Sequence, residues 1–209
     1  MRVAVLVSGS GTNLQALLDA RADLGAEIVV VISNKPEAYA LARARSAGIA
    51  TDCLSHKGFA DRASFDAALR DRVLAHGADL VVLAGFMRVL TPVFLDAFPD
   101  RVVNIHPSLL PSFPGVDAQA QALAYGVKVT GCTVHFVDAG TDTGPIIAQA
   151  AVPVRDDDTV ESLRARVLVE EHRLLPAAVG WFCEGRLVID GTRVRVLEAG
   201  AATTRVRPA

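Results

Sequence analysis

Short apolar runs alternate with amphipathic stretches along the first half of the chain. Runs rich in valine, isoleucine and leucine predict β-strands, and the stretches between them carry apolar residues at helical spacing. The strands are expected at Arg2–Val7, Glu27–Ser33, Thr51–Leu54, Asp79–Ala84 and Arg101–His106, and the helices at Thr12–Leu24, Glu37–Ala47 and Arg62–Ala75. Because these strands are almost continuously apolar, helices should cover both faces of the sheet. The pattern predicts a doubly wound, mostly parallel α/β fold.

The second half of the chain has a different pattern. Two strands are expected at Thr130–Val137 and Ile146–Val154, and the loop Asp138–Gly144 between them is too short for a parallel crossover. They should therefore extend the sheet with antiparallel strands.

A long helix follows these strands and leads into the C-terminal segment. Asp158 with Glu161 three residues later resembles an acidic capping box, so the helix should begin there and end near Gly185. A hairpin is expected at Asp190-Gly191, followed by a tail from Gly200. No repeat or linker marks a boundary, so one domain over residues 1–209 is the simplest interpretation.

Composition excludes several classes of protein. With 209 residues, 51% of them hydrophobic and 21% charged, the chain can bury a core and is not disordered. A net charge of −2 argues against a nucleic-acid binder, and no apolar run approaches the roughly 18 residues of a membrane span. The first apolar run is also too short for a secretory signal. Three scattered cysteines, Cys53, Cys132 and Cys183, give no disulfide framework, so a cytoplasmic location is expected.

A glycine-rich turn connects the first strand to the first helix. In Ser8–Gln15, exposed backbone N–H groups at a helix N-terminus favour an anion such as phosphate. The dinucleotide fingerprint fails because Leu14 occupies the third glycine position, and the second strand ends without an acidic residue, so NAD is not expected. The alternative is a simple turn with a helix cap made by Thr12 and Gln15.

Asn104 and His106 end an apolar strand. Two residues apart on a strand, their side chains point to the same side, at the carboxyl end where open α/β sheets bind ligands. An amide that stabilises an oxyanion beside an imidazole that moves a proton suits acyl transfer. The alternative is a structural histidine.

Two further segments are candidates for the same site. Asp142 lies in the loop Asp138–Pro145, where a turn aspartate is the simpler interpretation. If this loop folds over the Asn104–His106 strand, the carboxylate would favour the protonated imidazole. The segment Gly85–Leu90 either caps the core or forms an apolar slot for a flat aromatic ligand.

A metal site is not expected. Cys53-x-x-His56 and Cys132-x-x-His135 resemble zinc half-sites, but residues three apart on a strand face opposite sides. A serine or cysteine nucleophile is also unsupported, because the chain lacks a Gly-x-Ser-x-Gly elbow.

Four segments together resemble the phosphoribosylglycinamide formyltransferase family of purine biosynthesis. They are Gly9–Ala16, Leu83–Arg88, Asn104–Pro111 and Asp142–Pro145, and the resemblance runs in order from residue 1 to about residue 185. The segment Asn104–Pro111 alone is shared more widely with folate-dependent formyltransferases and hydrolases. The glycine turn, Phe113-Pro114-Gly115 and the short length point to the glycinamide ribonucleotide family.

The resemblance implies transfer of a formyl group from 10-formyltetrahydrofolate to the amine of 5-phosphoribosylglycinamide, with no metal and no NAD. Asn104 would stabilise the oxyanion, His106 would donate a proton, and Asp142 would favour the protonated form of His106 and help relay protons through water. The nucleotide phosphate would bind Gly11, Thr12 and Asn13, with Pro107 and Glu171 near the glycinamide. Folate would contact Arg62, Met87, Arg88, Val89, Leu90, Asn104, Asp138, Gly140 and Thr141.

We also expect a division of the chain into parts and a small set of partners. Residues of about 1–100 would form the phosphate-binding half, about 101–185 the catalytic and folate half, and 186–209 a hairpin and tail. Small molecules are the expected partners, with no nucleic acid or membrane, in a monomer or homodimer. Asp117 and Gln119 depart from the family, which often has histidines there.

Three points stay open at this stage. Glu171 follows Glu170 in a pattern that also fits a solvated helix face, although Leu168, Leu175 and Val179 share its side. Hydrolysis of the formyl-folate is an alternative reaction. A noncatalytic folate- or nucleotide-binding module is an alternative class of function.

Overall fold

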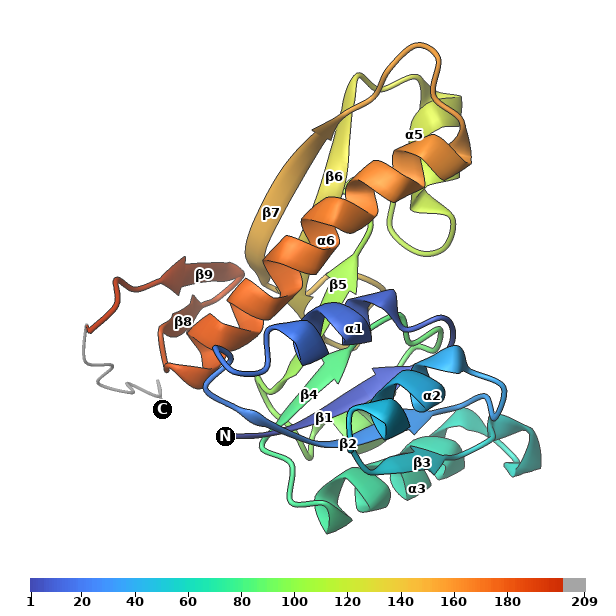
Figure 1. Cartoon of the computed structure of the whole chain (residues 1–209), viewed down its shortest axis with the longest axis vertical. Helices are drawn as coiled ribbons and strands as arrows, with labels where there is room; N and C mark the ends of the chain where they lie inside the picture. Colours follow the sequence, from blue (N-terminus) through green and yellow to red (C-terminus); the bar gives the residue numbers. More distant parts are fainter. Residues whose placement is uncertain (201–209) are drawn as a thin grey trace.

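The computed structural model describes residues 1–200, which form one mixed sheet flanked by helices (Figure 1). The strands are β1 (Arg2–Val7), β2 (Glu27–Ser33), β3 (Thr51–Cys53), β4 (Leu80–Leu83), β5 (Val102–His106), β6 (Val129–Phe136), β7 (Ile146–Pro153), β8 (Leu187–Asp190) and β9 (Arg193–Val196). The helices are α1 (Thr12–Asp19), α2 (Tyr39–Ser46), α3 (Arg62–Ala75), α4 (Pro92–Leu95), α5 (Ala118–Tyr125) and α6 (Val160–Cys183), and a 3-10 turn, η1, covers His56–Gly58.

The strands of the sheet change from parallel to antiparallel pairing at β6. Its strand order is β3-β2-β1-β4-β5-β6-β7-β9-β8, and the neighbours from β3 to β5 pair in parallel. β6 pairs antiparallel with both β5 and β7, and β8 and β9 form an antiparallel hairpin. The predicted parallel sheet with an antiparallel extension is therefore confirmed, as is the hairpin around Asp190-Gly191.

Two apolar clusters explain why the early strands are continuously apolar. Along β1, Val3, Val5 and Val7 pack on the side of α1, α2 and α6, whereas Ala4 and Leu6 pack on the side of α3 and α4. Successive side chains of a strand point to opposite faces, so both faces of a covered strand must be apolar. Figure 1 shows α6 running along β6 and β7, with α1 beside it.

The start of α6 differs from the prediction. Thr159 is the N-cap, and its side chain accepts from the Ser162 N–H while Ser162 Oγ accepts from the Thr159 N–H. Asp158 instead forms an ion pair with Arg166 and accepts from Ser162 Oγ. The predicted cap of Asp158 with Glu161 is therefore wrong by one residue, because two hydroxyl side chains satisfy the first backbone donors.

The start and end of α1 also differ from the prediction. Its N-cap is Gly11, in a left-handed conformation, and no side chain caps it, so the alternative of a cap made by Thr12 and Gln15 is wrong. α1 ends at Asp19 rather than Leu24, which is buried beyond the helix end and so matched the helical spacing through core packing alone.

Other differences fall on short elements and on the end of the chain. The sequence pattern did not predict α4 or α5; α5 is rich in alanine and glutamine and lacks a clear apolar stripe. The tail predicted from Gly200 lies outside the described residues beyond that position.

Gly11 is the position where the turn between β1 and α1 most needs a glycine. Its φ is +74°, and a Cβ there would lie 2.5 Å from Ala40 Cβ. We expect Gly11→Ala to lower the free energy of unfolding by about 2 kcal/mol or more, through left-handed strain plus the clash. Gly9→Ala is the matched control, because nothing lies within 4 Å of its added Cβ. Equal urea midpoints for the two variants would contradict this explanation.

Candidate active site

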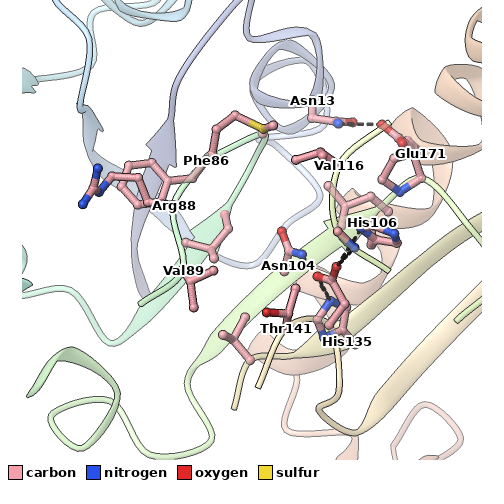
Figure 2. Close-up of a pocket in the computed structure, with 18 of the residues that line it drawn as sticks. Asn13, Phe86, Arg88, Val89, Asn104, His106, Val116, His135, Thr141 and Glu171 are labelled. Atoms are coloured by element: carbon pink, nitrogen blue, oxygen red, sulfur yellow. Dashed lines mark hydrogen bonds and ion pairs between the residues drawn. The ribbon is translucent and has the colours of Figure 1, made fainter. Parts of the chain in front are cut away.

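A cavity of about 430 Å³ lies between the carboxyl ends of β4 and β5, the loop after β6, and α6 (Figure 2). Its walls come from Asn13 in the first turn of α1, the segment after β4, β5 itself, the loop leading into α5, and one face of α6. Segments far apart in the sequence therefore meet at one place, where the parallel part of the sheet joins the antiparallel part.

Asn104 and His106 lie on the same face of β5 and both line this cavity. His106 is 4% exposed; its Nε2 is 2.9 Å from the Phe113 carbonyl oxygen and its Nδ1 is 3.3 Å from Asp142 Oδ2. A carbonyl and a carboxylate can only accept hydrogen bonds, so both ring nitrogens face acceptors. Each ring nitrogen of His106 is therefore placed to donate a hydrogen bond.

Asp142 reaches His106 because the loop after β6 folds back across β5. Asp142 adopts a positive φ of 56°, and its Oδ2 accepts the Gly115 N–H at 2.8 Å. Burial by itself would raise the pKa of Asp142. The nearby His135, the hydrogen bond from the Gly115 N–H and the charge of His106 together outweigh burial and hold the pKa of Asp142 below its usual value of 3.8. The carboxylate is therefore stabilised in its ionised form.

Close packing fixes the path of this loop. A Cβ at Gly144 would lie 2.0 Å from the Phe136 carbonyl oxygen, so only glycine allows β7 to start there. Asp138 Oδ1 accepts from the Gly140 N–H and from Thr143 Oγ1, which closes the turn around Asp142. Asp138, Gly140 and Thr141 line the cavity beside it.

His135 is a site residue that the sequence analysis considered only as half of a rejected zinc site. It is 1% exposed, and its Nε2 lies 3.1 Å from Asn104 Nδ2. Cys132 packs instead in the core against α6. The pairing of Asn104 with His135 across β5 and β6 is the signal that identifies it, and that register is visible only in the structure.

The glycine turn and α6 meet at the other end of the cavity. Asn13 Nδ2 donates to Glu171 Oε2 at 2.7 Å, as Figure 2 shows. Glu171 is 5% exposed, so the interpretation as a solvated helix face is wrong. Burial raises the pKa of Glu171, and the bond from Asn13 opposes this only in part. Gly11 and Thr12 do not line this cavity; Thr12 lines an adjacent hollow with Gln15, Arg43 and His172.

The segment after β4 serves both the core and the cavity. All residues of Gly85–Leu90 line the cavity. Phe86 and Leu90 are also buried in the core, whereas Met87 and Val89 are 64% and 41% exposed. The Arg88 guanidinium stacks 4.7 Å from the Phe65 ring, and Figure 2 shows it turned away from Asn104. Both interpretations of this segment therefore hold: it caps the core and it forms one wall of the cavity.

Some of the remaining predicted residues line the cavity, and others do not. Pro107 lines the cavity, as do Asp117 and Gln119, the two positions that depart from the family. Arg62 is the first residue of α3 and is not among the cavity-lining residues. Within residues 1–200, no cluster of three histidine, cysteine or acidic side chains is arranged to hold a metal ion. No helix in that range is long and apolar enough to cross a membrane.

The shifted pKa of Asp142 predicts how stability depends on pH. A carboxyl whose folded pKa lies below its usual value of 3.8 stabilises the fold above that value, and this stabilisation is lost as pH falls through the folded pKa. We expect the difference in unfolding free energy between the wild type and Asp142→Asn to shrink as pH falls from about 5 to about 2. Urea unfolding at a series of pH values measures it. A difference that is constant with pH would contradict the shift.

Comparison with known proteins places this site in a family. A family model described as formyl transferase matches residues 1–179. The chain is 57% identical to glycinamide ribonucleotide transformylase 1 from Symbiobacterium toebii, with a TM-score of 0.93 over 95% of this chain and 94% of that one. It is 44% identical over 189 residues to phosphoribosylglycinamide formyltransferase from Escherichia coli (strain K12), covering 90% of this chain and 89% of that protein.

Larger relatives contain the same unit. The chain is 52% identical over 193 residues to the trifunctional purine biosynthetic protein adenosine-3 of Drosophila melanogaster, covering 90% of this chain and 14% of that protein. Across six such trifunctional relatives, the chain spans 14–19% of their length. By the extent of these matches, the chain belongs to the formyl transferase family, among the phosphoribosylglycinamide formyltransferases.

Proposed function

We propose that this protein transfers the formyl group of 10-formyltetrahydrofolate to the amine of 5-phosphoribosylglycinamide in purine biosynthesis. The products are formylglycinamide ribonucleotide and tetrahydrofolate. The observation that carries the proposal is the convergence of Asn104, His106 and Asp142 on one cavity, in a chain of the formyl transferase family. The three unpaired cysteines suit a reducing compartment, so we place the reaction in the cytoplasm.

The geometry supports direct transfer in two steps. The amine attacks the formyl carbon, and the carbonyl oxygen becomes an oxyanion that accepts a hydrogen bond from Asn104 Nδ2. The bond from the formyl carbon to N10 of the folate then breaks, and His106 delivers a proton to that nitrogen as the formyl carbonyl re-forms. The ammonium proton of the attacking nitrogen leaves through water toward Asp142. Asp142 passes that proton to His106 across the 3.3 Å contact, which restores the acid for the next turnover.

Each substrate has its own side of the cavity in this proposal. The folate lies in the slot of Met87, Val89 and Leu90 against the loop of Asp138, Gly140 and Thr141. The amine substrate lies between Pro107, Asn13 and Glu171, with its phosphate at the N-terminus of α1, where backbone N–H groups have no side-chain cap. Since Arg62 does not line the cavity, the folate proposal depends on the other residues.

An absorbance assay of folate release tests the reaction. We expect release that depends on the phosphoribosylglycinamide. Losing one oxyanion donor in Asn104→Ala should cost about 10²–10³ in kcat, and losing the acid in His106→Ala about 10²–10⁴. His76→Ala is the control, because His76 caps the C-terminus of α3 outside the cavity. Release without the amine would indicate a hydrolase, and donor binding without release would indicate a binding module.

Glu171→Gln tests the place of the amine substrate. Glutamine keeps the size of the side chain and an oxygen for the Asn13 bond, so the fold should persist. Because a neutral amide binds the substrate's donors more weakly than a carboxylate, we expect KM for the phosphoribosylglycinamide to rise about tenfold, with KM for the folate unchanged. Glu170→Gln is the matched control, on the neighbouring residue that pairs with Arg173. Equal changes in both KM values would count against this placement.

A further inference from the structure

His135 is a buried polar side chain to which the proposed reaction gives no role. It stands directly opposite Asn104 in the antiparallel register of β5 and β6. The register between β6 and β7 shifts at Val134/His135, and such an irregularity re-aims the side chain that it carries. His135 Nε2 lies 3.1 Å from Asn104 Nδ2 and 3.7 Å from Asp142 Oδ1, while its Nδ1 lies 2.8 Å from the Phe136 carbonyl oxygen.

The Phe136 carbonyl oxygen determines which ring nitrogen of His135 carries a proton. A carbonyl oxygen only accepts, so His135 Nδ1 must carry a proton. In the neutral ring Nε2 then holds a lone pair, and it accepts from Asn104 Nδ2, which only donates. The amide of Asn104 is thereby turned with its nitrogen toward His135, and one N–H remains for a ligand in the cavity.

We propose that His135 is a positioning residue of this reaction, which holds the Asn104 amide so that its second N–H points at the developing oxyanion. This inference deepens the proposed function and rests on it. His135 itself exchanges no proton and acts only through Asn104. If the Asn104 amide could rotate freely about its side-chain torsions, it would stabilise the oxyanion less well. Oxyanion stabilisation requires a donor that is already oriented before the reaction.

A competing arrangement would make His135 a second cation beside Asp142. A doubly protonated ring would donate from Nε2 to Asp142 Oδ1 and would force the Asn104 amide to turn its oxygen inward. Both histidines would then compete for one carboxylate, since His106 Nδ1 already lies 3.3 Å from Oδ2. The distances favour Asn104 at 3.1 Å over Asp142 at 3.7 Å.

The structure also protects the hydrogen bond that fixes the tautomer. The Phe136 carbonyl oxygen is approached by Gly144, where a Cβ would lie 2.0 Å away. Any larger residue would displace this oxygen, to which His135 Nδ1 donates. Gly144, Phe136, His135 and Asn104 thus form one chain of contacts leading to the reacting atoms.

A matched pair of substitutions tests the role in catalysis. His135→Gln keeps an acceptor within reach of Asn104, whereas His135→Met has a similar length and no such acceptor. We expect His135→Met to lower kcat by about 10- to 100-fold, part of the effect of losing an oxyanion donor, with both KM values within about twofold. His135→Gln should recover most of that loss. Equal kcat values for the two variants would overturn the proposal.

A double-mutant cycle identifies the residue through which His135 acts. In an Asn104→Ala background, His135→Met should change kcat by less than about twofold, because the group it positions is gone. An undiminished loss in that background would overturn the proposal. The proposal would also be overturned if His135→Met still lowered kcat in the Asn104→Ala background but had no effect in an Asp142→Asn background. That result would show that His135 acts through the carboxylate of Asp142.

A measurement independent of activity separates this proposal from the proposed function. Long-range ¹H–¹⁵N spectra of the full chain near neutral pH, assigned with His135→Gln, should show His135 protonated at Nδ1 and bare at Nε2. The side-chain NH₂ signal of Asn104 should shift in His135→Met. A doubly protonated His135, or an unmoved Asn104 signal, would overturn the inference even in an active enzyme. If the spectra are as expected but the protein transfers no formyl group, only the proposed function would be overturned.

Discussion

The active site depends on the register between β5 and β6. Val103 and Ile105 of β5, with Val134 of β6, pack into the core against α6, so the intervening residues must face the other way. Those intervening residues are Asn104, His106 and His135. A slip of one residue would drive these polar side chains into the core and expose the valines. Burial of one apolar face therefore positions the chemistry on the other.

Polar side chains can be buried here because each is matched to a partner. Asp142 contacts two histidines and a backbone N–H, and Glu171 receives the Asn13 amide. Unpaired, such groups would cost several kcal/mol in an apolar setting, so their pairing is a condition of folding as well as of function. Backbone strain lies in the same region, with positive φ at Phe113, Asp117 and Asp142. Strain of about 1 kcal/mol or more at each residue is typical where a site must hold a carbonyl or carboxylate in one place.

Sequence periodicity predicted the elements that bury a continuous apolar stripe. It failed where an element is held by other means: α5 has little apolar contrast, and Leu24 is buried in the core without being helical. Among site residues, spacing indicated that Asn104 and His106 share a face, because that follows from strand geometry alone. It did not reveal His135, whose importance comes from a cross-strand neighbour 31 residues away. Nor could spacing show that Arg62, at the start of α3, lies outside the cavity wall.

The two halves of the site are joined by α6. Near its middle Glu171 receives the Asn13 amide from the α1 turn, although the two residues are 158 apart in sequence. Two turns earlier Arg164 lines the cavity, and the helix also packs against β6. A single helix of 24 residues is stiff, so it keeps the turn before α1 at a fixed distance from the strand that carries Asn104 and His106. The proposed transfer between two bound substrates requires such a fixed distance, because an error of about 1 Å in the approach of the amine to the formyl carbon would cost about 10²-fold in rate.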